Sequence, residues 1–508
     1  MDIAQSLESS QPLKCIDMHT SGEPTRIIYS GFPTLRGTLL EQRDQAMSQH
    51  DDIRQRLMLE PRGHDDMYGA IIRPETELVA SGDAHVGTLF THNGGFSTMC
   101  GHATIALGRF LVDTHDATVF PRRDALVVDD EGEKTVGLNL HAPCGLVRVR
   151  VPVSDDGRKS DPSRPVTFLS TPAFATAIQL SVSVPKSAEV RWPELGERES
   201  IVLDVSYGGA FYAIVTAQEL GFRDGLQDVD LGAVSRCIQK LKPYLSARPE
   251  IAAAVQHPQD GRLSFLYSVM IVDSTVGAKS GDVDGAETGL CYFAEDQVDR
   301  SPTGSCVSAR MALAHAKGLR PVGQRWAYNS LVSNAFAAGM FNAEIVTEEP
   351  GGVVVKVEGQ AYYTVPTSLP IWDFLFDSKY SPLGQYSEFA GYTNAVTKER
   401  VGYDEVKEYT TLISTALVKN YGLQKGDTVA LFSPNTIWYP GGQVPPLRLF
   451  PGQTNKDICG FLNFSSGTIG LPKAVMISHH NVIAQRLQVQ QETPADYKKI
   501  PAVLPLFH

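Results

Sequence analysis

Two stretches of sequence decide the fold: THNGGFSTMCGHATIALGRF (residues 91–110) and VDRSPTGSCVSAR (residues 298–310). In each of them a small side chain, Cys100 or Thr303, precedes a glycine at the start of a helical pattern. The first N–H groups of a helix have no intrahelical partner and carry the positive end of the helix dipole. A helix start can therefore hold a carboxylate, and it favours the thiolate of a cysteine. Two such starts facing each other predict a binding site for an amino acid.

The composition is that of a globular protein with a core. Of the 508 residues, 42% are hydrophobic and 20% are charged, and at roughly 150 residues per domain the length predicts several domains. The net charge of -12 disfavours nucleic acid and anionic membranes as partners, because both attract basic surfaces. We find no signal-peptide pattern and no apolar stretch long enough to span a membrane, so we expect a cytoplasmic protein.

The seven cysteines are scattered along the chain and are never spaced as CxxC. Neither a disulfide framework nor a metal site is expected from such a pattern. The thiols are therefore expected to be reduced.

The region from Ile16 to about Thr364 consists of short β-type runs with few helical patterns. Helical periodicity occurs at 39–57 and 232–245 and after each of the two motifs. The strands are expected at 25–29, 147–153, 201–205, 210–215, 265–272, 343–346 and 353–357. This pattern predicts a strand-rich α+β fold in which two halves each wrap a sheet around one motif helix. Two prolines, Pro366 and Pro370, place the end of this domain near residue 365.

The two motifs carry residues suited to proton abstraction beside a carboxylate. This reaction needs a well-aimed base and stabilisation of the developing charge. Cys100 would supply the base if the helix start lowers its pKa from about 8.5. The N–H groups of Gly101 and His102, with those of Gly304 and Ser305, would stabilise the charge. The alternative is an inert buried cysteine, and the matching second motif favours the catalytic interpretation.

The two motifs together resemble those of the proline racemase family. The stretches IDMHTSGEPTR (16–26) and EPRGHDDMYGA (60–70) are similar to other signature segments of that family. The resemblance covers residues 14–364. It implies a diaminopimelate-epimerase-like fold of two pseudo-duplicated β-barrel-like halves, each around a central helix, with the substrate between them and no cofactor.

Racemases of this family use one cysteine in each motif, whereas this chain has Thr303 at the second position. An alcohol is too weak an acid to replace a thiol as an acid/base partner near neutral pH. The chain therefore resembles the dehydratase branch, which acts on trans-3-hydroxy-L-proline. The resemblance implies that Cys100 removes the α-proton, that the 3-hydroxyl leaves as water, and that Δ1-pyrroline-2-carboxylate forms. Activity as a proline racemase or hydroxyproline 2-epimerase stays an open alternative. The oligomeric state is also open, and a homodimer is one possibility.

The resemblance also assigns roles to residues around the two reactive positions. Gly101, His102, Gly304 and Ser305 would hold the substrate carboxylate and ring, and Asp299 would pair with the ring ammonium. Cys306 stands where the family usually has glycine and is either a packed core side chain or a second base. Four further polar residues are interpreted as structural or supporting: His19, Glu23, His64 and Asp65.

The C-terminal region carries a different motif, FSSGTIGLPK at residues 464–473. Its composition suits a loop that cradles phosphate with backbone amides, and it resembles the phosphate loop of acyl-adenylate-forming enzymes of the 4-coumarate–CoA ligase type. The loop residues are Ser465, Ser466, Gly467, Thr468, Gly470 and Lys473. We expect residues 366–508 to be an incomplete α/β adenylating-enzyme fragment without ligase activity. Residual AMP or ATP binding in a bifunctional chain is the alternative.

Overall fold

The computed structural model divides the chain into two compact units, Met1–Tyr363 and Thr364–His508. It describes residues 12–129, 133–279, 281–294, 297–336 and 339–364. Of the second unit it describes two strand pairs and separate helical positions between residues 405 and 419. The first unit holds both motifs.

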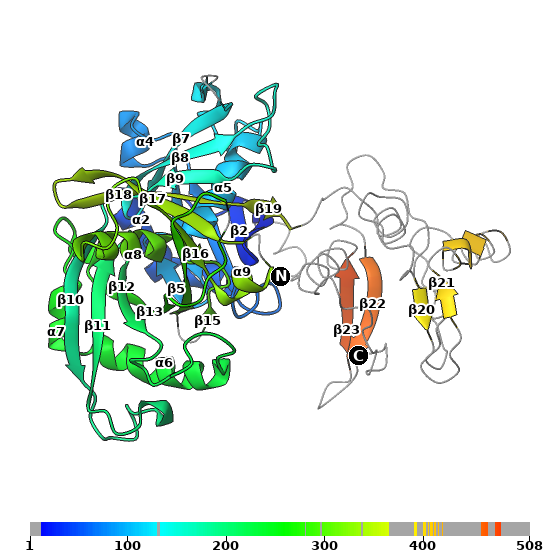
Figure 1. Cartoon of the computed structure of the whole chain (residues 1–508). Helices are drawn as coiled ribbons and strands as arrows, with labels where there is room; N and C mark the ends of the chain where they lie inside the picture. The colour runs from blue at the N-terminus through cyan, green and yellow to red at the C-terminus, as the bar shows by residue number, and fades with distance from the viewer. Residues whose placement is uncertain are drawn as a thin grey trace. The chain divides into compact units, whose positions relative to one another are not determined.

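The first half of this unit is a curved sheet around one helix, α5 (Figure 1). Hydrogen-bonded neighbours follow the order β19, β1, β2, β3, β4, β7, β8, β9, and the short strands β5 and β6 pair with β4 and β7. The strands are β1 (Lys14–Thr20), β2 (Glu23–Ser30), β3 (Tyr68–Arg73), β4 (Val86–His92), β5 (Gly95–Ser97), β6 (Val128–Asp129), β7 (Thr135–Ala142), β8 (Gly145–Pro152), β9 (Val166–Leu169) and β19 (Ala361–Tyr363). The helices are α2 (Leu39–Gln49), α3 (Asp51–Met58), α4 (Glu77–Ser81) and α5 (Gly101–Asp113).

The second half repeats this arrangement around helix α8. Its neighbours follow the order β18, β17, β16, β14, β13, β12, β11, β10, with β15 paired to β14. The strands are β10 (Phe174–Ser183), β11 (Ser200–Tyr207), β12 (Phe211–Thr216), β13 (Leu266–Asp273), β14 (Gly285–Phe293), β15 (Gln297–Val298), β16 (Arg325–Asn329), β17 (Phe341–Glu349) and β18 (Gly352–Gly359). The helices are α6 (Leu231–Ser246), α7 (Pro249–Ala254), α8 (Gly304–Ala316) and α9 (Leu331–Phe336).

The strand pairings confirm the predicted duplication. In the first half the parallel pairs are β2 with β3 and β4 with β7, and in the second half they are β12 with β13 and β14 with β16. The motif helix follows β5 in one half and β15 in the other, and each of these strands pairs with the strand before it. Pairing of β9 with β18 joins the halves into one sheet. Cys100 and Thr303 consequently occupy equivalent positions in the two halves.

The two motif helices are the centre of the core. Every residue of α5 from Gly101 to Val112 is buried, and so is every residue of α8 from Gly304 to Ala314. Helix α5 packs on β1, β8 and β9, and α8 packs on β10, β11 and β18. A helix that is buried on all sides needs mostly small or apolar residues, which both motifs supply. The buried exceptions have partners: Arg109 donates to the Asp161 carbonyl at 2.7 Å, and Arg310 pairs with Glu287 at 2.8 Å.

One expected helix, at 39–57, is instead two helices that meet at His50. The backbone of His50 leaves the helical region with φ -134° and ψ 21°. Asp51 and Asp52 then form an acidic first turn for α3, which stabilises the new helix start. The other expected helices and strands are present with bounds shifted by a few residues.

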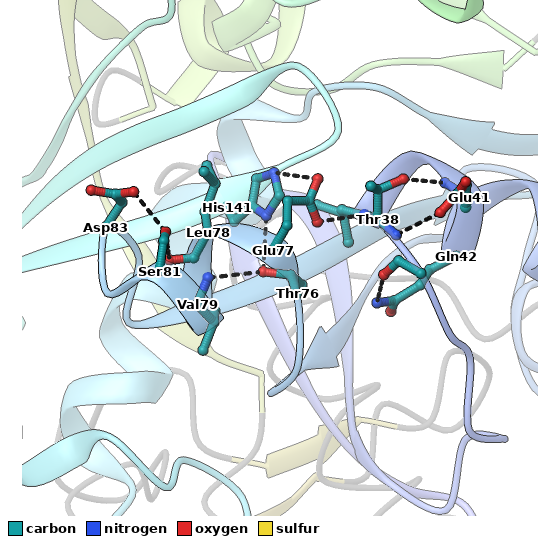
Figure 2. A network of polar contacts seen from close by, with 12 residues as sticks. Thr38, Glu41, Gln42, Thr76, Glu77, Leu78, Val79, Ser81, Asp83 and His141 are labelled. Carbon is teal, nitrogen blue, oxygen red and sulfur yellow. Dashed lines mark hydrogen bonds and ion pairs between the residues drawn. The ribbon is translucent and has the colours of Figure 1, made fainter.

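Two helices of the first half, α2 and α4, begin at side-chain caps (Figure 2). Thr38 and Glu41 form a reciprocal capping box at the start of α2. Glu77 on α4 accepts the Leu39 N–H at 2.8 Å, and Thr76 accepts the Val79 N–H at 3.3 Å. These bonds connect α2 to α4 without any residue of the two motifs.

In the second unit the described strands form two antiparallel pairs. Strand β20 (Gly391–Thr393) pairs with β21 (Arg400–Gly402), and β22 (Cys459–Ser465) pairs with β23 (Lys473–Ser478). Ser465 and Lys473 are register partners at the end of the second pair. The other predicted phosphate-loop residues, Ser466, Gly467, Thr468 and Gly470, lie outside the described residues.

Among the described helices, none has the length and apolar character needed to cross a membrane.

Candidate active site

The starts of α5 and α8 meet through their glycines. A Cβ atom built on Gly101 would lie 2.6 Å from the Cα of Gly304, and one built on Gly304 would lie 2.9 Å from the Cα of Gly101. Only residues without a side chain permit this approach of two backbones. The approach brings the first N–H groups of both helices, which have no intrahelical carbonyl partner, to one place. Such a pair of helix starts can bind a carboxylate.

Cys100 caps the first of these helices. Its Sγ accepts the N–H of Ala103 at 3.4 Å, and both ring nitrogens of His102 lie 3.4 Å from the same sulfur atom. Thr20 holds this turn from the neighbouring strand by donating to the His102 carbonyl at 2.9 Å. The thiol is thus fixed at the point where the two helices meet.

The predicted lowering of the Cys100 pKa is wrong. Burial raises the pKa of this thiol well above its ordinary value, and the negative charges of Asp299 and Glu23 raise it further. The N–H of Ala103 and the Tyr68 hydroxyl act in the opposite direction as donors, but burial outweighs them. His102 is no base for the thiol, because burial lowers its pKa to about 3 and keeps the imidazole neutral. The buried site therefore favours the thiol form of Cys100.

Thr303 and Asp299 form a hydrogen-bonded pair at the start of α8. The Thr303 hydroxyl donates to Asp299 Oδ2 at 2.7 Å, and the other oxygen of Asp299 accepts the Ser301 N–H at 2.8 Å. Thr303 has φ 62°, a left-handed conformation that is unusual for a β-branched residue and is typical of functional sites. Burial raises the pKa of Asp299 to about 6. The pair thus holds a carboxylate beside the alcohol that replaces the second cysteine.

A second carboxyl group, that of Glu23, lies within electrostatic reach of Cys100 and Asp299. Glu23 begins β2, is 0% exposed, and its Oε2 accepts the N–H of Arg300 at 2.8 Å. In the part of the chain that the structure describes, its Oε1 has no hydrogen-bond partner. Burial and the charge of Asp299 raise the pKa of Glu23 well above its ordinary value. The sequence analysis interpreted Glu23 as a structural or supporting residue, and its complete burial beside the second motif was not visible in the sequence.

Two tyrosines line the Cys100 side of the site. The Tyr68 hydroxyl lies 2.5 Å from Ser97 Oγ and 3.1 Å from the Tyr267 hydroxyl. The Tyr68 ring packs edge-to-face with the His102 ring, and their centroids are 4.8 Å apart. Tyr68 belongs to the 60–70 stretch, whereas nothing in the sequence around Tyr267 marked it as a site residue. The two strands that carry them, β3 and β13, are equivalent in the two halves.

The remaining candidate residues lie in or beside the first turn of α8. Ser305 Oγ is 2.6 Å from the Tyr212 hydroxyl, which fixes the first turn of α8. Cys306 is fully buried within the hydrophobic core cluster. A further thiol, Cys291, lies within hydrogen-bond reach of the Thr303 hydroxyl and 3.3 Å from Ser268 Oγ. Among the described residues of the first unit, none of the six cysteines forms a disulfide.

The chain belongs to the proline racemase family, whose model matches residues 15–374. It is 40% identical over 368 residues to the human protein named trans-3-hydroxy-L-proline dehydratase, covering 71% of this chain and 92% of that one. A protein of the same name from Colwellia psychrerythraea is 34% identical over 357 residues, covering 70% and 88%. Residues 448–508 match a second model, described as AMP-binding enzyme.

The fold agrees with that of a solved relative. The structure of a probable proline racemase from Agrobacterium radiobacter K84 aligns with a TM-score of 0.55 at 22% identity, covering 69% of this chain and 91% of that one. The likeness confirms the predicted fold of the first unit. In the described residues we find no cluster of three or more His, Cys, Asp or Glu side chains that could hold a metal ion.

Proposed function

We propose that the chain dehydrates trans-3-hydroxy-L-proline to Δ1-pyrroline-2-carboxylate, without a cofactor. The observation that carries this proposal is the Cys100/Thr303 pair at two facing helix starts, in a chain whose relatives are named for this dehydration. One face of the substrate meets a thiol that can act as a base. The other meets an alcohol that cannot return a proton at neutral pH.

The substrate is a zwitterion, and the site offers a partner for each charge. The N–H groups of Gly101, His102, Gly304 and Ser305 would hold the carboxylate between the two helix starts. Asp299, ionised above a pH of about 6, would pair with the ring ammonium. This pairing also supports catalysis, because the Asp299 charge is one cause of the raised Cys100 pKa. An ammonium beside Asp299 offsets that charge and favours the thiolate.

In the reaction the Cys100 thiolate takes the α-proton and becomes a thiol. The electron pair of the broken Cα–H bond forms the C2=C3 double bond as the C3–O bond breaks. The hydroxyl group gains one proton and leaves as water. The enamine then tautomerises to the cyclic imine, so that the substrate loses one water molecule and no electrons.

The proposal is tested by incubating the full-length protein with trans-3-hydroxy-L-proline, trans-4-hydroxy-L-proline and L-proline. We expect the pyrroline product, followed by NMR, from the first compound alone. Inversion at Cα without loss of water would instead identify a racemase or epimerase. No turnover of any of the three would contradict the proposal.

The rate should fall at acidic pH because of Asp299. As pH falls through about 6, this carboxylate becomes protonated and loses its attraction for the ring ammonium, so kcat/KM should decrease. Asp66 pairs with Arg300 at 2.6 Å, and its charge raises the pKa of Asp299. Asp66→Asn should therefore move the acidic limb of the kcat/KM profile to lower pH. An unchanged limb in that variant would exclude Asp299 as the titrating group.

Thr303→Cys should introduce racemase or epimerase activity, because it restores a thiol on the second face. We expect slow inversion of L-proline, measured by chiral chromatography, at a level absent from the wild-type protein. Solvent deuterium should appear at Cα of the inverted product. Thr303→Ser is the matched control, since it keeps an alcohol and should give no inversion.

The proposal also assigns a role to each of the two parts of the chain. We assign the dehydration to residues 1–365 and treat residues 366–508 as a fragment of the adenylating-enzyme type without ligase activity. The match of residues 448–508 to the AMP-binding model supports the assignment of the fragment. Acyl-adenylate formation by the full-length protein would contradict the lack of activity.

A further inference from the structure

The dehydration leaves one proton transfer without an assigned residue. Hydroxide is a poor leaving group, so the departing oxygen needs a proton donor in the transition state. Cys100 is occupied with the α-proton, and Asp299 with the ring ammonium. The donor must be a group that is protonated at neutral pH and close to both.

The stereochemistry of the substrate limits where this donor can lie. In trans-3-hydroxy-L-proline the hydroxyl is trans to the carboxylate, so the hydroxyl and the α-hydrogen lie on the same face of the ring. The donor must therefore reach the face that Cys100 serves. Thr303 begins the opposite helix and donates its own proton to Asp299, which makes it unsuitable.

Glu23 has the contacts expected of the donor. One carboxyl oxygen is fixed by the Arg300 N–H at 2.8 Å, while the other is buried without a partner. Glu23 is the register partner of Thr20, whose hydroxyl donates to the His102 carbonyl at 2.9 Å, so Glu23 lies beside the start of α5 as well as beside Arg300 of the second motif. Two carboxyl groups in one buried site cannot both ionise easily, so one stays protonated. Asp299, with hydrogen-bond donors on both oxygens, is the better anion, and Glu23 is the better acid.

We propose that Glu23 is the acid that protonates the departing 3-hydroxyl. This inference rests on the proposed dehydration. As the C3–O bond breaks, the O–H proton of Glu23 moves to the leaving oxygen and water forms. Glu23 becomes a carboxylate while Cys100 becomes a thiol, and one proton returned from Cys100 to Glu23 resets the site.

The test is Glu23→Gln in the full-length protein, because glutamine can still accept the Arg300 N–H but is not an acid. We expect elimination of water from trans-3-hydroxy-L-proline to slow by about 10²-fold or more. Two reactions that need no such acid should stay within a few-fold of wild type. One is exchange of the α-proton of L-proline in deuterium oxide, and the other is fluoride release from trans-3-fluoro-L-proline, since fluoride leaves without protonation.

The control is Glu77→Gln, which makes the same chemical change at a carboxylate that also accepts a backbone N–H at 2.8 Å (Figure 2). It should leave all three reactions unchanged. If Glu23→Gln does not fold, Glu23→Asp keeps the carboxyl group but withdraws it, and water elimination should again slow more than fluoride release.

An equal loss of all three reactions, or a raised KM alone, would overturn the role of Glu23 as the acid. The same holds if Thr303→Val, and not Glu23→Gln, shows the loss specific to the hydroxyl leaving group. These results differ from failure of the proposed function, in which the wild-type protein itself would form no pyrroline.

Discussion

Replacing Cys100 with serine is expected to lower kcat/KM for dehydration by about 10³-fold or more, the upper range for loss of a general base. A serine hydroxyl has nearly the same size, and Cys100 is 4% exposed, so the change removes the acidity of the thiol and little packing. The Ala103 N–H that now meets sulfur at 3.4 Å can bond to the hydroxyl oxygen instead. Folding should be retained, as judged by thermal unfolding.

The control for this variant is Cys15→Ser, which changes a partly buried cysteine outside the two motifs. It should keep wild-type activity. The sharper readout is exchange of the α-proton in deuterium oxide, which should disappear in Cys100→Ser along with dehydration. Exchange that persists in that variant would assign the base to another group.

Local sequence patterns predicted the two motif helices and part of the strands of the first unit, whereas strands such as β3, β4 and β7 were not among the expected ranges. An alternating apolar run placed β8 within a few residues, because this strand has one buried face with a period of two, and a continuous valine run that is buried on both faces placed β18. The small and apolar residues after Cys100 and Thr303 placed α5 and α8. The break at His50 was missed, since both flanking segments carry helical periodicity.

Pairings between distant segments could not be predicted in the same way. Strand β1 pairs with β19, and β9 with β18, at sequence separations that no local period encodes. Glu23 shows the consequence for the site. In the sequence it belongs to a Gly-Glu-Pro turn, which is usually solvated, whereas in the fold it is buried against Arg300 from the second motif.

The pKa of Cys100 was misjudged for a related physical reason. A helix start was visible in the sequence, and its N–H groups favour a thiolate. The depth of burial and the two carboxyl groups beside the thiol depend on how the two halves pack. Both raise the pKa, and together they outweigh the helix start.

Gly101→Ala is expected to disrupt activity and stability together, although alanine is normally the better helix residue. The added Cβ would lie 2.6 Å from the Cα of Gly304 and 3.1 Å from its nitrogen, so the two helix starts would have to separate. Overpacking of this kind costs about 1–3 kcal/mol of unfolding free energy. Separation by even about 1 Å would also misplace the N–H groups around the carboxylate and lower kcat/KM by about 10²-fold.

The matched control is Gly137→Ala on β7, where an added Cβ meets no atom within 4 Å. That variant should keep wild-type activity and unfold at or slightly above the wild-type temperature, because alanine reduces the freedom of the unfolded chain. Gly304→Ala should behave like Gly101→Ala, since its Cβ would lie 2.9 Å from the Cα of Gly101. Because both substitutions enlarge the same contact, their combined effect should be less than the sum of the single effects, as measured by denaturant unfolding and kcat/KM. Full additivity, or wild-type activity in either single variant, would show that the carboxylate is not held at this contact between the two helix starts.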